Sequence, residues 1–146
     1  MIHWFSEDTS FVLKNKRLIS NWLKQIASSS DTSVGELNYI FCSDPYLLDI
    51  NKKYLGHDYY TDIITFDNSD EFTAQGLING DIFISIDTVK LNAEQYGEGF
   101  DRELHRVIAH GLLHLLGFDD TSEELQKEMT RQENLALDLY DKISKL

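Results

Sequence analysis

Two histidines four residues apart are the side chains in this sequence that most clearly could do chemistry. His110 and His114 stand in the run AHGLLHLLGFDD, which covers residues 109–120. On a helix this spacing sets the two rings about 40° apart in projection, with Cβ atoms about 6 Å apart, so both can reach one ion. A histidine pair alone is weak support for a metal site, because such pairs are often packed or hydrogen-bonded in a core.

The residues that follow the pair strengthen the metal interpretation. Gly117 can adopt the left-handed conformation that ends a helix, and Asp119 and Asp120 come directly after it. Two imidazoles and one carboxylate leave positions open on a zinc ion, which is typical of a catalytic rather than a structural site. Such an ion polarises a phosphoryl or carbonyl oxygen and lowers the pKa of bound water. We therefore predict a catalytic metal site at the end of this helix.

Gly111 occupies the position where a metalloprotease helix carries the glutamate that acts as general base. A glycine inside a helix costs about 1 kcal/mol relative to alanine, so it needs a reason. We interpret it as room for a group that approaches the ion closely, and it argues against a peptidase.

Charge and cysteine content limit the classes of function. The formal net charge of −12 repels phosphate backbones, so a role with nucleic acid needs a local basic patch or a bound cation. Cys42, the one cysteine, lies in an apolar run and is expected to be a buried free thiol, which suits a reducing cytosol. No apolar run approaches about 18 residues, so we expect neither export nor membrane spanning.

The remaining elements follow from hydrophobic periodicity and capping residues. We expect strands at 2–8, 35–44, 61–68 and 78–87, and helices at 15–30, from Ser43 or Asp44 to about Leu55, at 88–97, at 101–116 and after the capping pattern at 121–124. The third and fourth strands are predicted to be neighbours joined by a longer loop. This predicts an α+β single domain, a four-stranded mixed sheet with about five helices packed on it and the metal site at the end of a late helix.

Three ordered motifs resemble those of the YbeY family, bacterial metal-dependent endoribonucleases that act as rRNA maturation factors. HGLLHLLGFDD matches the signature H-G-x-L-H-L-x-G-[YF]-D-H at every fixed position but the last. NKKYLGHDYYTDIITF, from Asn51 to Phe66, follows N-x-x-[YF]-R-x-x-D-x-x-T-[DN]-[VI]-L-S-F, and the strand motif G-D-[IL] stands at Gly80–Ile82. The resemblance covers nearly the whole chain and implies one YbeY-like metallohydrolase domain over residues 1–146.

This resemblance implies the site residues and the cofactor. The third histidine of the signature falls on Asp120, so His110, His114 and Asp120 are the expected catalytic residues and the ligands of one ion, with zinc as the expected metal. A carboxylate in place of an imidazole makes manganese or iron more competitive. Leu55 stands where the family carries an arginine suited to a phosphate contact, and leucine cannot replace it. Lys52, Lys53 or His57 could compensate, although each is typical of a solvated surface.

The resemblance also implies a cytoplasmic hydrolase of phosphodiester bonds in single-stranded ribosomal RNA. It would act in rRNA maturation and ribosome quality control, with the small ribosomal subunit or its assembly factors as partners, and with neither a membrane nor DNA. Asp62 can be read equally well as a turn residue or as a catalytic one. His105 faces away from the ion on the helix and is expected to be a packing or surface residue. Glu103 is expected to be a helix N-terminal acid.

Other classes of function remain open from the residues alone. A ribosome-associated protein could use the metal only to pin the helix end, and Leu55 makes this more credible. A metzincin-like metallopeptidase shares the ligand spacing but lacks the glutamate base. A non-haem iron oxygenase also uses two histidines and one carboxylate.

Overall fold

A four-stranded mixed sheet forms the centre of the protein in the computed structural model, which describes residues 1–71 and 73–146. The strands β1 (Ile2–Ser6), β2 (Ser33–Cys42), β4 (Leu77–Ser85) and β3 (Ile63–Asp67) lie side by side in that order. β1 runs parallel to β2, β2 runs parallel to β4, and β3 is antiparallel to β4. The four predicted strands and the pairing of the third with the fourth are thus confirmed.

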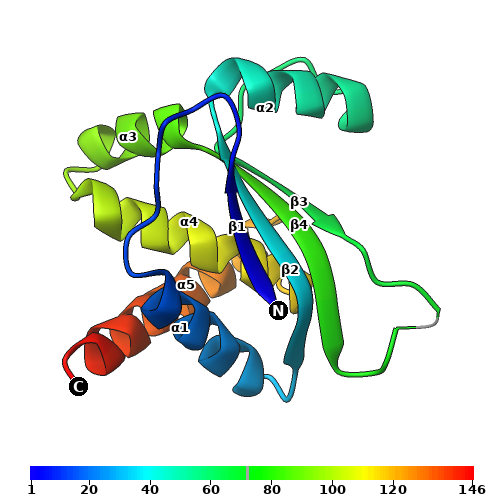
Figure 1. Cartoon of the computed structure of the whole chain (residues 1–146), viewed down its shortest axis with the longest axis vertical. Helices are drawn as coiled ribbons and strands as arrows, with labels where there is room; N and C mark the ends of the chain where they lie inside the picture. Colours follow the sequence, from blue (N-terminus) through cyan, green and yellow to red (C-terminus); the bar gives the residue numbers. More distant parts are fainter. Residues whose placement is uncertain (72) are drawn as a thin grey trace.

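Helices cover both faces of this sheet unequally. α1 (Lys16–Ser28), α3 (Ile86–Gln95), α4 (Phe100–Leu115) and α5 (Glu123–Ser144) gather on one side, while α2 (Asp44–Ile50) crosses one end of the sheet (Figure 1). Because side chains alternate along a strand, β4 sends Ile82 and Ile84 into the main core and Phe83 into a smaller cluster with Leu47 of α2. The predicted α+β single-domain arrangement with five helices is confirmed.

Two buried hydrogen bonds fix the helical layer in place. The hydroxyl of Tyr39 on β2 donates to the carbonyl of Ile108 on α4 at 2.7 Å, and both residues are fully buried. The indole of Trp22 on α1 donates to the carbonyl of Ala136 on α5 at 2.8 Å. Breaking either bond would leave a buried polar group without a partner, so the first holds α4 against the sheet and the second holds α1 against α5. The later turns of α4 lie beside β3, where Gly111 faces Ile63.

Two local details differ from the sequence expectations. The helix expected to reach Leu55 ends as an α-helix at Ile50, and one wider π turn, η1 (Asn51–Leu55), completes it. Helix α5 is capped by Ser122, whose hydroxyl accepts from the Leu125 amide at 3.1 Å. The residue three places on from that cap is leucine, so the reciprocal bond of a capping box cannot form.

Cys42 is a buried free cysteine, as expected, and burial followed by nearby carboxylates raises its pKa to about 12. A thiol held in its protonated form is unreactive, so we assign it to packing. Among the described residues, no helix combines the length and the apolar character needed to cross a membrane.

Candidate metal centre and its cleft

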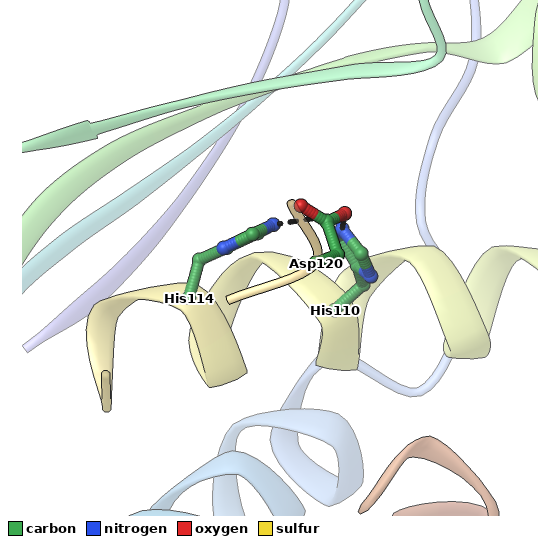
Figure 2. Close-up of side chains that lie close together, drawn as sticks. All are labelled: His110, His114 and Asp120. Carbon is green, nitrogen blue, oxygen red and sulfur yellow. Dashed lines mark ion pairs between the residues drawn. The ribbon is translucent and has the colours of Figure 1, made fainter. Parts of the chain in front are cut away.

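The last turns of α4 and the loop after it bring together three side chains of types that bind metal ions. His110 and His114 project from the same face of α4 toward Asp120 on the returning loop (Figure 2). The Asp120 Oδ2 atom lies 3.6 Å from Nε2 of His110 and 3.6 Å from Nε2 of His114. One donor atom from each residue lies within 4.8 Å of the other two.

These separations suit a small cation. A distance of 3.6 Å is too long for a hydrogen bond, so the three groups do not simply satisfy one another. Ligands at 2.0–2.2 Å from a tetrahedral zinc ion are about 3.3–3.6 Å apart, which matches the distances from Asp120 to the two histidines. Two imidazole nitrogens and a carboxylate oxygen are also the donors of catalytic zinc sites. The residues present therefore fit such an ion.

The turn after α4 decides which of the two aspartates faces the histidines. Gly117 has a φ of 103°, and its amide donates to the carbonyl of His114 at 3.0 Å, which closes the helix. Asp119 then accepts from the amide of Asp120 at 2.7 Å and from the hydroxyl of Thr121 at 3.2 Å. Asp119 thus holds the turn, and the structure brings Asp120, not Asp119, to the two rings.

Replacing Gly117 with alanine is expected to destabilise the protein and loosen the site. A Cβ meets no atom within 4 Å there, so the cost comes from the left-handed backbone and should be about 1–2 kcal/mol. The free energy of unfolding in urea measures it, and zinc affinity should fall as well because Asp120 is no longer held. Gly99→Ala is the matched control, since Gly99 also has open space but a φ of −69°. Equal stability of the two variants would contradict this account.

Glu133 is a residue of the candidate site that the sequence reasoning missed. It lies on α5 with only 8 % of its surface exposed, and its Oε2 atom is 2.6 Å from Nδ1 of His110. Arg106 donates to the other oxygen at 3.1 Å. Burial lowers the pKa of His110, but the hydrogen bond and charge of Glu133, with smaller contributions from Asp120 and Asp62, outweigh it and raise that pKa. With Nδ1 bonded to Glu133, the Nε2 atom of His110 is the one directed to Asp120.

The signal for Glu133 was present in the sequence. Glu133 lies between Met129 and Ala136 on the face of α5 that is buried against the core. Acids are almost never buried without a partner, so a glutamate in an apolar stripe indicates a specific contact.

A cleft of about 450 Å³ is lined in part by His110, His114 and Asp120. Its other walls come from η1, the loop after η1 and the start of β3, and they consist of Asn51, Leu55, His57, Tyr59, Thr61, Asp62, Ile63, Ile64, Thr65 and Leu115. Burial raises the pKa of Asp62, and the charge of His110 partly opposes this. A carboxyl group with a raised pKa that lines the same cleft as a candidate metal site is suited to proton transfer when the ion is bound.

Gly111 has a different role from the one that its place in the motif suggests. A Cβ at this position would lie 2.9 Å from Cγ2 of Ile82 and 3.1 Å from Cδ1 of Ile63, so the glycine faces the sheet. The interpretation that it leaves room beside the ion is wrong: it lets α4 pack closely on β3 and β4. A glutamate at this position would clash with the sheet, which leaves no place for the base of a metallopeptidase.

The other titratable residues near the motif have structural roles away from the His110–His114–Asp120 cluster. His105 packs on Tyr140 with ring centroids 4.3 Å apart, which confirms the packing role, and burial lowers its pKa. Glu103 lies in the first turn of α4, as expected, and is buried, which raises its pKa. Lys52 pairs with Asp58 at 3.4 Å.

Lys53 lies over the ring of Tyr54, 5.4 Å from its centroid. Neither Lys52 nor Lys53 lines the cleft, whereas His57 does. Within the part of the chain that the structure describes, no lysine or arginine lines this cleft. Neither lysine therefore compensates for Leu55, and of the three residues considered only His57 is placed to do so.

Comparison with known proteins identifies the family. Residues 4–141 match the family described as Endoribonuclease YbeY. A protein of Cytophaga hutchinsonii named Endoribonuclease YbeY is 51 % identical over 138 residues, which are 94 % of each chain. A protein of the same name from Phocaeicola vulgatus is 47 % identical over 95 % of this chain and 98 % of its own.

A solved structure shares the fold. The solution structure of TM1509 from Thermotoga maritima superposes with a TM-score of 0.66 at 26 % identity, covering 96 % of this chain and 89 % of that one. The shared fold, the three motifs and the length of the matches agree. The chain belongs to the Endoribonuclease YbeY family.

Proposed function

We propose that this protein is a metal-dependent endoribonuclease that hydrolyses phosphodiester bonds in single-stranded RNA, with His110, His114 and Asp120 as its metal ligands. The observation that carries the proposal is the convergence of two imidazole nitrogens and one carboxylate oxygen at the floor of an open cleft. Such an ion would supply local positive charge, which a chain of net charge −12 otherwise lacks toward a phosphate backbone.

Each residue of the candidate site has a separate proposed role. His110 and His114 would bind the ion through Nε2, with Glu133 fixing the orientation of the His110 ring. When bound, the ion polarises a phosphoryl oxygen and makes water more acidic. The carboxylate of Asp62, which lines the same cleft, would accept the proton of the attacking water. Gly111 contributes no base because it faces the sheet.

Zinc is the proposed metal, with manganese or iron as alternatives because of the carboxylate ligand. We further propose that the substrate is ribosomal RNA in the cytoplasm. The protein would act in rRNA maturation and ribosome quality control, with the small ribosomal subunit or its assembly factors as partners. The name of the relatives supports an RNA substrate, and the buried free thiol of Cys42 fits a reducing compartment.

Cleavage of a labelled single-stranded RNA tests the proposal. Protein treated with a chelator should be inactive, added zinc or manganese should restore cleavage, and His114→Ala should remain inactive with either metal. A DNA strand of the same base sequence should stay intact. A protein that binds zinc at this site yet leaves RNA uncut under all these conditions would instead favour the non-catalytic alternative.

Replacing Leu55 with arginine is expected to tighten RNA binding. Leu55 lines the cleft with 45 % of its surface exposed, so a guanidinium there can reach a phosphate without being buried. One added phosphate contact should steepen the dependence of log affinity on log salt by about 0.7 for a single strand. Titrations at several salt concentrations measure this slope.

Leu55→Gln is the control for this prediction, since it is polar and of similar size but uncharged. A slope that does not change in Leu55→Arg would show that the phosphate passes elsewhere in the cleft.

A further inference from the structure

Two aromatic rings stand exposed in the wall of the cleft that holds the metal-binding residues. His57 and Tyr59 are stacked, with centroids 5.1 Å apart and planes 19° apart, and the Tyr59 hydroxyl lies 2.9 Å from Nδ1 of His57. Tyr59 keeps 56 % of its surface exposed, although it lines the same cleft as His110 and His114. Neither ring contributes to the hydrophobic core, so packing does not explain the pair.

The loop that carries this pair is held in a defined shape. The buried side chain of Asn51 donates from Nδ2 to the carbonyl of Tyr59 at 2.9 Å, and the amide of His57 donates to the carbonyl of Asn51 at 3.2 Å. Gly56 supplies the turn with a φ of 67°. A ring held this way loses little conformational freedom when a ligand stacks on it.

The charge of the cleft determines what kind of contact a nucleic acid can make here. The charge-neutralising phosphate contacts that dominate affinity come from lysine and arginine, and among the described residues neither type lines the cleft. Base stacking on an aromatic ring needs no cation and is tolerant of sequence, because every base has a flat face. A duplex hides those faces, whereas a single strand presents them.

We propose that the Tyr59–His57 pair is a stacking site for a nucleobase of single-stranded RNA, which guides the neighbouring phosphodiester toward the His110–His114–Asp120 cluster. This inference rests on the proposed nuclease function and adds the means by which a strongly acidic protein recognises its strand. It assigns binding to the bases rather than to the phosphates.

Anisotropy titrations with a labelled single-stranded oligoribonucleotide, at a temperature and time at which a gel shows no cleavage, test this site. Tyr59→Ala should bind it roughly tenfold more weakly, and Tyr59→Phe should bind it about as well as the wild type because the ring is retained. Tyr60→Ala is the matched control: Tyr60 is the next residue and is 63 % exposed, but it does not line the cleft, so affinity should not change.

An oligomer of the same length with abasic sites separates stacking from phosphate contact. The wild type and Tyr59→Ala should bind the abasic strand equally, and the salt dependence of binding should be the same for both proteins. Equal affinity of the two proteins for the normal strand would overturn the proposal, and so would an equal loss for both strands.

A cleavage assay of the wild type with ordinary RNA tests the nuclease proposal independently of the stacking site. If the wild type cuts RNA while Tyr59→Ala binds the normal strand unchanged, only the stacking site is overturned. If the wild type leaves RNA intact, the nuclease proposal falls, and base-dependent binding through Tyr59 alone supports the stacking site.

Discussion

Asp120→Ala is expected to lose bound zinc almost completely after dialysis, as His114→Ala should. Asp120 Oδ2 is equidistant from the two imidazole nitrogens at 3.6 Å, so it supplies the third donor of the cluster. Residues that only orient a ligand typically change metal affinity by about 10–100-fold, and loss of a direct ligand should exceed that range. Metal analysis of purified protein, with affinity from competition against a chelating dye, measures the effect.

Asp119→Ala is the matched control for this experiment. Among the described residues its carboxylate bonds to the amide of Asp120 and the hydroxyl of Thr121, so its loss should loosen the turn and weaken zinc binding moderately. Asp120→His should retain the metal, because it restores the residue that the family signature carries at this position. Full zinc content in Asp120→Ala would remove Asp120 from the ligand set.

The elements that position the site could be predicted because their signals are local. The spacing of His110 and His114, the glycine at 117 and the alternation along β3 and β4 each depend on residues within a few positions of one another. Local periodicity fixes which face of an element is buried, and glycine fixes where a helix can end. The α+β fold and the end of α4 could therefore be predicted from the sequence.

Contacts between elements that are distant in the sequence could not be predicted from local patterns. Gly111 was misread because its neighbours, Ile63 and Ile82, lie on strands far away in the chain, and only the packing of α4 on the sheet brings them together. Glu133 is 23 positions from His110, and the two meet because α5 folds back along α4. Position in a motif indicates chemistry, but the direction of a side chain depends on which element packs against it.

Glu133→Ala is expected to weaken zinc binding by about 10–100-fold while leaving all three metal-binding residues in place. The Glu133 carboxylate accepts from Nδ1 of His110 at 2.6 Å, and this bond fixes the ring and makes its Nε2 a better donor. The same carboxylate raises the pKa of His110, so in the wild type a proton competes with the metal at acidic pH. Removing Glu133 removes both effects, which act on zinc affinity in opposite directions.

The pH dependence of the Glu133→Ala effect distinguishes orientation from simple loss of stability. Without Glu133 the pKa of His110 falls, so the variant suffers less proton competition, and its deficit should be smaller at about pH 6 than at about pH 8. Arg106→Gln removes the other partner of Glu133 but keeps the bond to His110, so its effect on zinc affinity should be much smaller. Asn134→Ala, at the exposed neighbouring position, should change nothing. A residue that orients a ligand must act through the ring that it holds, so its effect on zinc affinity must depend on the protonation of that ring. If the loss of zinc affinity in Glu133→Ala were the same at both pH values and equal to the loss in Arg106→Gln, Glu133 would only stabilise the packing of α5 on α4.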